Sequence, residues 1–156
     1  MTETSRPLLL LSNDDGFQAK GIQCLIETLR PIADLIVVAP DGPRSGSSAA
    51  ITSICPIQVK CLTEGDGLKL YSCSGTPTDC VKIALHSFVP RVPDMVIGGI
   101  NHGDNSSVNV HYSGTMGVVI KGCLKGIPSV GFSLCNHDAD ADFKPAYPYM
   151  RPIVEE

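Results

Sequence analysis

The sequence lacks the features that mark several classes of protein. It has no excess of basic residues, since 12 lysines and arginines face 16 acidic residues and the formal net charge is −4 at pH 7. A basic footprint for nucleic-acid polymers or anionic membranes is therefore missing. No apolar run has the length of a membrane span, and residues 1–7 lack the apolar core of a signal peptide. These absences predict a cytoplasmic protein without a membrane or nucleic-acid-polymer partner.

Several catalytic and binding motifs are also missing from the sequence. No Gly-x-Gly-x-x-Gly follows the first apolar run, there is no Walker loop, and no Gly-x-Ser-x-Gly elbow is present. The seven cysteines are odd in number and include no Cys-x-x-Cys pair. We expect them to be reduced, small buried hydrophobes, with Cys24 and Cys123 at apolar-periodic positions. A zinc site or a disulfide framework is not expected.

Apolar runs and helical patterns alternate along a chain of 156 residues, which fits one domain over 1–156. We predict strands over 8–12, 34–39, 57–61, 68–72, 93–97 and 127–134. Helices are predicted over 21–30, from Thr76 to about Phe88, and over 113–124. The last of these is expected to bury Met116, Val119, Ile120 and Cys123.

Strand, helix and strand within about thirty residues form a βαβ unit, which requires a parallel sheet. The predicted fold class is therefore α/β, a Rossmann-like, three-layer, doubly wound and mostly parallel sheet. The strands over 57–61 and 68–72, joined by a turn at 64–67, are predicted to be a β-hairpin insertion beside that sheet. The tail over 136–156 is polar and proline-rich, and we expect it to be irregular.

Two adjacent carboxylates follow the first predicted strand directly. Asn13, Asp14 and Asp15 come after four leucines and a serine, and Gly16 follows them. Side chains of neighbouring residues in a strand point to opposite faces, so the two carboxylates can converge only if the backbone turns there. A divalent cation between them would relieve their repulsion. The alternative is a solvated loop in which Asp14 caps the next helix.

Two more predicted strands end in loops with polar side chains. One loop holds Arg44, Ser45 and the two serines beyond Gly46, and the other, over 98–105, holds Asn101, His102 and Asn105. Parallel strands end at the same edge of a sheet, so these residues can meet the acidic pair. Carboxylate, amide and hydroxyl oxygens suit Mg²⁺, Mn²⁺ or Ca²⁺ better than zinc. His102 fits a surface or supporting position better than a catalytic one.

Two glycine-containing turns are suited to an anion. The turn over 45–48 offers hydroxyl groups and accessible backbone N–H groups, and Ser113-Gly114-Thr115 opens a helix. Arg44 and Lys121 are candidate charge partners, with solvated surface as the alternative. A cation site beside a phosphate site is typical of enzymes that hydrolyse phosphate esters, in which the metal polarises a phosphoryl oxygen and activates water.

Five motifs occur in order along the chain. They are Leu10-Leu-Ser-Asn-Asp-Asp-Gly16, Val38-Ala-Pro-Asp41 with Arg44-Ser-Gly46, Gly75-Thr-Pro-Thr-Asp-Cys80, Gly99-Ile-Asn101 with Gly103 and Asn105, and Tyr112-Ser-Gly-Thr115. Together they closely resemble the SurE family, the stationary-phase survival nucleotidases. The resemblance covers the chain from about Leu8 to Leu134.

The resemblance implies a metal-dependent phosphatase, a 5′-nucleotidase that acts on nucleoside 5′- or 3′-monophosphates. It implies one divalent metal ion, Mg²⁺ or Mn²⁺ with Ca²⁺ possible in a crystal, held by Asp14, Asp15, Ser45 and Asn101. Asp14, Asp15 and Asn101 would also be the catalytic residues. Contacts with the phosphate or nucleotide would come from Gly46, Ser48, Asn105, Ser113, Gly114 and Thr115, with Asn13 supporting the acidic pair.

The sequence departs from the family pattern near the expected site. Phe17-Gln-Ala-Lys-Gly21 replaces a more usual proline before the glycine, and His102 stands where a small residue is common. Family members usually continue beyond the length of this chain, into a segment that helps build a dimeric or tetrameric homo-oligomer and shapes the pocket. The alternative function is therefore a regulatory module of the same fold that binds nucleotide or metal but turns over weakly.

Overall fold

A computed structural model describes residues 6–138 and 140–156. Its strands are β1 (Leu8–Ser12), β2 (Asp34–Pro40), β3 (Val59–Gly65), β4 (Leu68–Cys73), β5 (Met95–His102) and β6 (Ser129–Leu134). Its α-helices are α1 (Lys20–Leu29), α2 (Pro77–Ser87), α3 (Gly114–Cys123) and α4 (Tyr147–Glu155). Two short 3₁₀ helices, η1 (Ser107–His111) and η2 (Lys144–Ala146), lie in the connections. The predicted strands and helices up to 134 are confirmed, with shifted boundaries.

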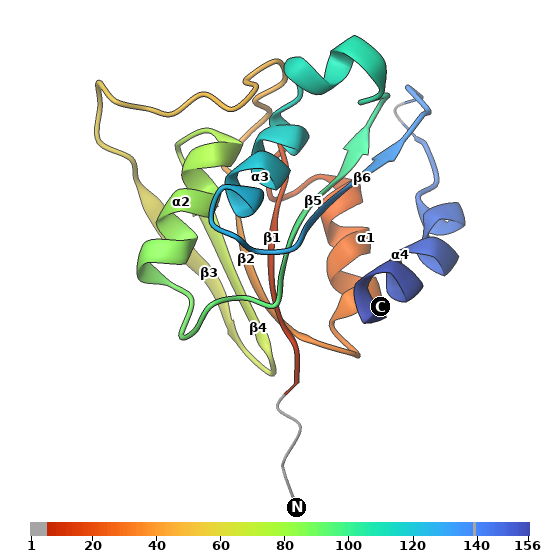
Figure 1. Ribbon diagram of the computed structural model, residues 1–156, viewed down its shortest axis with the longest axis horizontal. Helices are drawn as coiled ribbons and strands as arrows, with labels where there is room; N and C mark the ends of the chain where they lie inside the picture. Colours follow the sequence, from red (N-terminus) through yellow and green to blue (C-terminus); the bar gives the residue numbers. More distant parts are fainter. Residues whose placement is uncertain (1–5, 139) are drawn as a thin grey trace, which may run out of the picture.

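The six strands form one sheet in the order β3-β4-β2-β1-β5-β6. Every neighbouring pair is parallel except β3 with β4. Helices α2 and α3 cover one face of the sheet, and α1 and α4 cover the other (Figure 1). The chain moves outward from β1 to β2 on one side and from β5 to β6 on the other. The predicted three-layer, doubly wound fold is confirmed, with its switch point between β1 and β5.

Strand β1 supplies both faces of the core. Leu9 and Leu11 pack with α1, while Leu8 and Leu10 pack with α2 and α3. All four leucines are buried because β1 lies between β2 and β5, with helices on both faces. An uninterrupted apolar run is the expected pattern for such a strand.

The predicted hairpin is confirmed as antiparallel β3 and β4, but its turn is shorter than expected. Asp66 and Gly67 connect the strands, both with positive φ (50° and 72°), as a type I′ turn requires. Strand β4 pairs in parallel with β2 over six residues, Leu68 to Cys73. The hairpin is therefore an edge of the main sheet, with β3 as its outermost strand.

None of the four residues predicted to be buried in α3 is fully buried, since Met116 and Val119 are only half-buried. Ile120 and Cys123 are exposed, whereas Thr115 and Val118 pack on the sheet at Gly98 and Gly117 packs on the loop at Ser48. The helix is apolar on several sides, so periodicity did not define its orientation. A Cβ at Gly117 would lie 2.3 Å from the Ser48 carbonyl oxygen, so close packing selects the small-residue face.

The prediction of an irregular tail is also wrong. Residues 147–155 form α4, which packs against α1, and the side chain of Met150 is completely buried in the core. Proline at the first turn is compatible with a helix start, so Pro148 does not oppose this element. Burial of one apolar face stabilises a helix that its polar and proline-rich composition did not predict.

The cysteines are only partly as expected. All seven are free, but only Cys73 and Cys80 are buried, and Cys123 is one of four exposed cysteines. Among the described residues, no helix is long and apolar enough to cross a membrane. The first five residues, part of the stretch considered for a signal peptide, lie outside the described residues.

Candidate functional site

A cleft of about 280 Å³ opens at the carboxyl edge of the sheet, at the switch point between β1 and β5. Seven of the residues predicted for the site line it: Asp14, Asp15, Ser45, Gly46, Asn101, Asn105 and Ser113. They come from four separate loops and strand ends. The structure therefore brings together the side chains that the sequence placed at several strand ends.

The chain turns sharply where β1 ends, and Asn13 holds that turn. Its side-chain amide donates to the Gly16 carbonyl oxygen (2.9 Å) and accepts from the Gly16 N–H (3.2 Å). Gly16 has a φ of 100°, and an added Cβ would lie 3.3 Å from the backbone of Gly42. The turn lets both Asp14 and Asp15 line the cleft. Asn13 is fully buried and does not line the cleft, in agreement with a supporting position.

Asp14 is fixed in place by α3 and by the loop after β2. Its carboxylate accepts a 2.6 Å hydrogen bond from the Thr115 hydroxyl, and its carbonyl oxygen accepts from the Arg44 N–H at 2.6 Å. Asp14 is 5% exposed and Thr115 is fully buried. Since its hydroxyl already bonds to Asp14, Thr115 orients the carboxylate, rather than offering that hydroxyl to a phosphate.

Asp15 lies beside Asp14 and accepts a 3.3 Å hydrogen bond from the backbone N–H of His102. Burial and the negative charge of Asp14 raise the pKa of Asp15, while the His102 N–H acts in the opposite direction. Two neighbouring carboxylates in a partly desolvated cleft favour binding of a cation, because it would offset their repulsion. This electrostatic environment agrees with the predicted metal site.

Asn101 reaches the cleft on β5, which is longer than predicted. Residues 98–102 belong to the strand, so the expected loop over 98–105 begins only after His102. Helix α3 packs closely on this part of β5. A Cβ at Gly98 would lie 2.8 Å from the Thr115 carbonyl oxygen, so the close packing requires glycine there. The register shifts between Gly98 and Asn101, an irregularity of the kind that redirects side chains next to active sites.

The Asn101 side chain has a defined orientation. Its amide nitrogen donates to the Gly103 carbonyl oxygen at 2.8 Å, so the amide oxygen is the atom with which it can bind a cation. Asn105 also lines the cleft, and its amide donates to the Ser133 hydroxyl at 2.9 Å.

The loop after β2 contributes Ser45 and Gly46 to the cleft, but not its arginine. Arg44 forms an ion pair with Asp41 at 2.9 Å and donates to the Ser74 carbonyl oxygen. The hydroxyl of Ser48 donates to the His111 carbonyl oxygen at 2.6 Å. Arg44 and Ser48 therefore connect the loop to its surroundings and do not line the cleft.

Helix α3 begins at the cleft. Ser113 caps it by accepting a 3.0 Å hydrogen bond from the Met116 N–H. A Cβ at Gly114 would lie 2.6 Å from the Asp14 Cβ and from the Ser47 hydroxyl oxygen. Gly114 thus lets the helix start approach the acidic turn, which places unpaired N–H groups near the cleft. Lys121, the other candidate charge partner, lies near the opposite end of this helix and does not line the cleft.

Several lining residues were not predicted as site residues. They are Gly103, Asp104, Asn109, Tyr112 and His137, together with His102, which was assigned to a surface or supporting position. Asp104 accepts hydrogen bonds from Ser106 and Asn109, and those bonds lower its pKa. Asp104 lies within the motif that ends at Asn105, and Asn109 lies between that motif and the next, so their positions could have indicated them. His137 gave none, because it lies in the tail that was expected to be irregular.

The residues of the cleft fit a hard divalent cation. Two carboxylates, one amide oxygen and one hydroxyl form the all-oxygen set that Mg²⁺ or Mn²⁺ prefers. Over the part of the chain that the structure describes, no group of three His, Cys, Asp or Glu side chains could hold a metal ion. The chemistry of the donors therefore agrees with the predicted ligands Asp14, Asp15, Ser45 and Asn101 and gives no support to zinc.

Comparison with known proteins identifies relatives over nearly the whole chain. The family model "Survival protein SurE" matches residues 9–156. A curated protein of Phocaeicola vulgatus named 5′-nucleotidase SurE is 66% identical over 151 residues, 97% of this chain and 59% of that protein. One of the same name from Bacteroides thetaiotaomicron is 60% identical over 152 residues, again 97% and 59% of the two chains.

The structural comparison agrees. A crystal structure described as the SurE protein from Aquifex aeolicus superposes with a TM-score of 0.86 at 34% identity, and covers 96% of this chain and 59% of that one. The chain thus spans 59% of the length of these relatives.

Proposed function

Because this chain belongs to the SurE family, we propose that it acts in the hydrolysis of nucleoside monophosphates to nucleoside and phosphate, at the 5′ or the 3′ position. The main support for this proposal is that one cleft beside the start of α3 is lined by Asp14, Asp15, Ser45 and Asn101. The printed name of the Phocaeicola vulgatus and Bacteroides thetaiotaomicron relatives, 5′-nucleotidase, supports the same activity. The proposed cofactor is one Mg²⁺ or Mn²⁺ ion.

Each part of the cleft has a proposed task. When bound, the cation supplies polarisation of a phosphoryl oxygen and activation of water. The Thr115 hydroxyl holds the Asp14 carboxylate in place at the cleft, and the His102 N–H holds that of Asp15, so that both would be ready to bind the cation. The N–H groups and dipole at the start of α3, beside Ser113, stabilise the phosphate and the negative charge that develops on it.

Phosphate release from a panel of 5′- and 3′-nucleoside monophosphates tests the proposal, with Mg²⁺, Mn²⁺ or EDTA present. We expect turnover with metal and none with EDTA. Asp14→Asn should lower turnover at least about 100-fold, because losing even a supporting group at a metal site costs 10–100-fold. Asp66→Asn in the β3–β4 turn is the matched control and should leave turnover unchanged, since the Asp66 side chain is almost fully exposed. Full activity of Asp14→Asn at saturating metal would reject the assignment.

The alternative is a regulatory module that binds nucleotide or metal and turns over weakly. Equilibrium binding of 5′-AMP and Mn²⁺, measured beside turnover, separates the two functions. Binding of both without phosphate release from any substrate of the panel would favour the module, and metal-stimulated release would favour the enzyme.

A further inference from the structure

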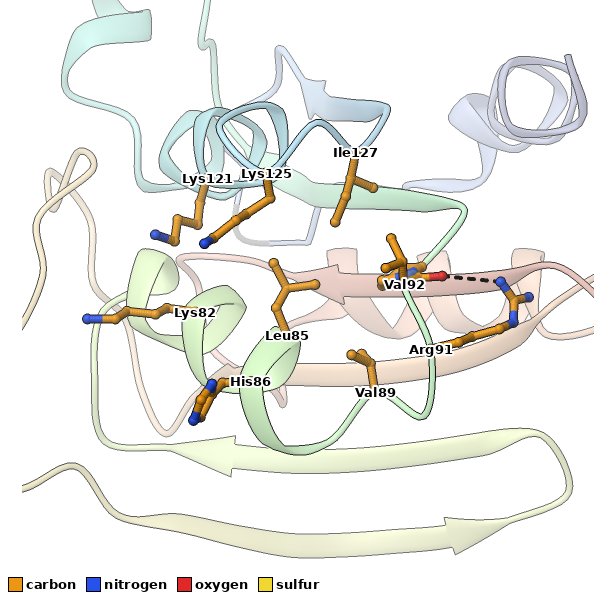
Figure 2. Close-up of a pocket in the computed structure, with 10 residues that line it drawn as sticks. Lys82, Leu85, His86, Val89, Arg91, Val92, Lys121, Lys125 and Ile127 are labelled. Atoms are coloured by element: carbon orange, nitrogen blue, oxygen red, sulfur yellow. Dashed lines mark hydrogen bonds between the residues drawn. The ribbon is translucent and has the colours of Figure 1, made fainter.

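A groove of about 440 Å³, larger than the cleft, lies between the C-terminal halves of α2 and α3 (Figure 2). Its lining combines basic and apolar side chains and includes no acidic residue. The lining residues are Lys82, Leu85, His86, Val89, Arg91, Val92, Pro93, Lys121, Lys125 and Ile127. The groove therefore differs in chemistry from the acidic cleft.

Three lysines line the groove. Among the described residues, no carboxylate lies within ion-pair distance of Lys82, Lys121 or Lys125, whereas Arg91 pairs with Asp94 at 2.8 Å. Their ammonium groups lie at the same end of the groove (Figure 2). The three positive charges at this end of the groove repel one another, in a protein whose net charge is negative. An anion between the lysines would relieve that repulsion.

The helix dipole explains only part of this arrangement. Lys121 and Lys125 lie at the C-terminal end of α3, where cations interact favourably with the helix. Lys82 lies in the middle of α2, on the other side of the groove, so the same cause does not apply to it. The convergence of both sides on one space therefore points to a ligand.

The apolar side chains form the floor beside the lysines. Leu85 near the end of α2 and Val89 just after it are half-buried, Ile127 beyond α3 is buried, and Val92 on the loop after α2 is 71% exposed (Figure 2). Leaving such surface in water is unfavourable by about 25 cal/mol per Å². A ligand with an apolar body would cover this floor while its charged groups reach the lysines.

The groove is separate from the proposed catalytic cleft. The two cavities share no lining residue. Ser113 lines the cleft and Lys121 lines the groove, and eight residues of helix correspond to roughly 12 Å along its axis. One small ligand would not occupy both sites.

We propose that this groove is a second binding site, for a small organic polyphosphate. The phosphate groups contact Lys82, Lys121 and Lys125, and the organic body covers Leu85, Val89 and Val92. A cavity of this volume lies within the range of small-molecule sites, about 300–1,000 Å³. Several phosphates are favoured over one because three cations converge, and lysine binds phosphate as a point charge.

Methyl NMR and calorimetry with ATP, inorganic tripolyphosphate and adenosine test the site. EDTA is present throughout so that metal does not recruit the probes to the cleft. We expect ATP to shift the methyl signals of Leu85, Val89 and Val92, tripolyphosphate to bind at least about tenfold more weakly, and adenosine more weakly still. Equal affinity for ATP and tripolyphosphate would show that the apolar side chains of the groove do not contribute to binding. Shifts confined to Ile100 beside the cleft would overturn the site.

Charge reversal assigns the binding to the lysines. The double variant Lys121→Glu and Lys125→Glu should weaken ATP binding at least about tenfold, which corresponds to about 1.4 kcal/mol. Lys60→Glu on the exposed edge strand β3 is the control and should change it less than about twofold. Val92→Ser should weaken binding of ATP but not of tripolyphosphate. Equal losses in the double variant and in Lys60→Glu would show non-specific attraction and reject the proposal.

Discussion

At the scale of single residues, the candidate site depends on one side chain, that of Thr115, and on the lack of a side chain at Gly114. Thr115 donates to Asp14, and Gly114 lets α3 approach the same aspartate. Both were predicted as phosphate contacts. The Thr115 hydroxyl instead donates to the Asp14 carboxylate, which is the kind of supporting hydrogen bond that the proposed metal ligand would need.

Replacing Thr115 by valine should weaken metal binding without unfolding the protein. The change removes the hydroxyl that donates to the Asp14 carboxylate at 2.6 Å and leaves an oxygen of this nearly buried group without its donor. We expect Mn²⁺ affinity, measured by calorimetry, and phosphate release to fall by about 10–100-fold. Thr115→Ser keeps the hydroxyl and should retain most of both. Unchanged Mn²⁺ affinity in Thr115→Val would contradict this supporting role.

Adding a methyl group at position 114 should disturb the same contact sterically. The new Cβ of Gly114→Ala would lie 2.6 Å from both the Asp14 Cβ and the Ser47 hydroxyl oxygen, so the helix start must move. Overpacking of this kind costs about 1–3 kcal/mol of unfolding free energy. Gly42→Ala is the control, because nothing lies within 4 Å of its Cβ. Urea denaturation measures both, and similar midpoints would argue against the close approach.

At the scale of elements, α2 does more than cover the sheet. Its first turn has a capping box between Thr76 and Asp79. The Asp79 carboxylate also accepts hydrogen bonds from the N–H (3.1 Å) and hydroxyl (2.6 Å) of Thr52. Thr52 lies in the long loop that leads from Ser45 and Gly46 to β3. One helix cap therefore holds a loop whose first residues line the candidate site.

Replacing Asp79 by asparagine should destabilise the protein and flatten its acid sensitivity. Although burial raises the pKa of Asp79, the hydrogen bonds from Thr52 and Thr76 outweigh it, so the net pKa lies below the ordinary value. Its stabilisation is present above the ordinary pKa and is lost as the pH falls through the lower folded value, below about 4. We expect a loss of about 1–2 kcal/mol at pH 7.

Urea denaturation at pH 7 and at pH 3 measures both effects. The difference between wild type and Asp79→Asn should shrink at the lower pH, because the Asp79 carboxylate of the unfolded chain, with its higher pKa, binds a proton there before that of the folded protein does. Asp66→Asn, in the β3–β4 turn, should behave like wild type. A constant difference at both pH values would show that the charge of Asp79 contributes nothing.

At the scale of the whole molecule, the C-terminal helix completes the core on one face of the sheet. Met150 is fully buried against the cluster that contains Leu25 and Leu29 of α1. Phe143, just before α4, packs on the same cluster and lies edge to face with His102, at a centroid distance of 5.9 Å. The tail therefore connects the core to the border of the cleft. The predicted homo-oligomer and cytoplasmic location stay predictions.

Truncating Met150 should measure how far α4 contributes to stability. Met150→Ala leaves a cavity at a fully buried position, and we expect a loss of about 2–5 kcal/mol of unfolding free energy. Tyr149→Ala, one residue away with its side chain largely exposed, should cost less than about 0.5 kcal/mol. Thermal and urea denaturation give both values. Equal effects would show that α4 does not pack stably on α1.

The sequence by itself determined the order of the elements, the parallel sheet and the candidate ligands. Asp14 and Asp15 follow a continuous apolar run, and Asn101 follows another, so strand ends were visible as changes from apolar to polar residues. The family was recognisable from motifs in order, and the comparison confirms it. These features are local in the chain, which is why local patterns reveal them.

Only the tertiary structure decided the orientation of α3, the presence of α4 and the partners of the site residues. Helix α3 is apolar on several sides, and close contact at Gly114 and Gly117 chose the face. Helix α4 is stabilised by its burial against α1, and the composition of this segment gives no sign of that packing. Thr115 meets Asp14 across 101 residues of sequence. The physical reason is common to all three, because packing between distant segments outweighs local preference wherever that preference is weak.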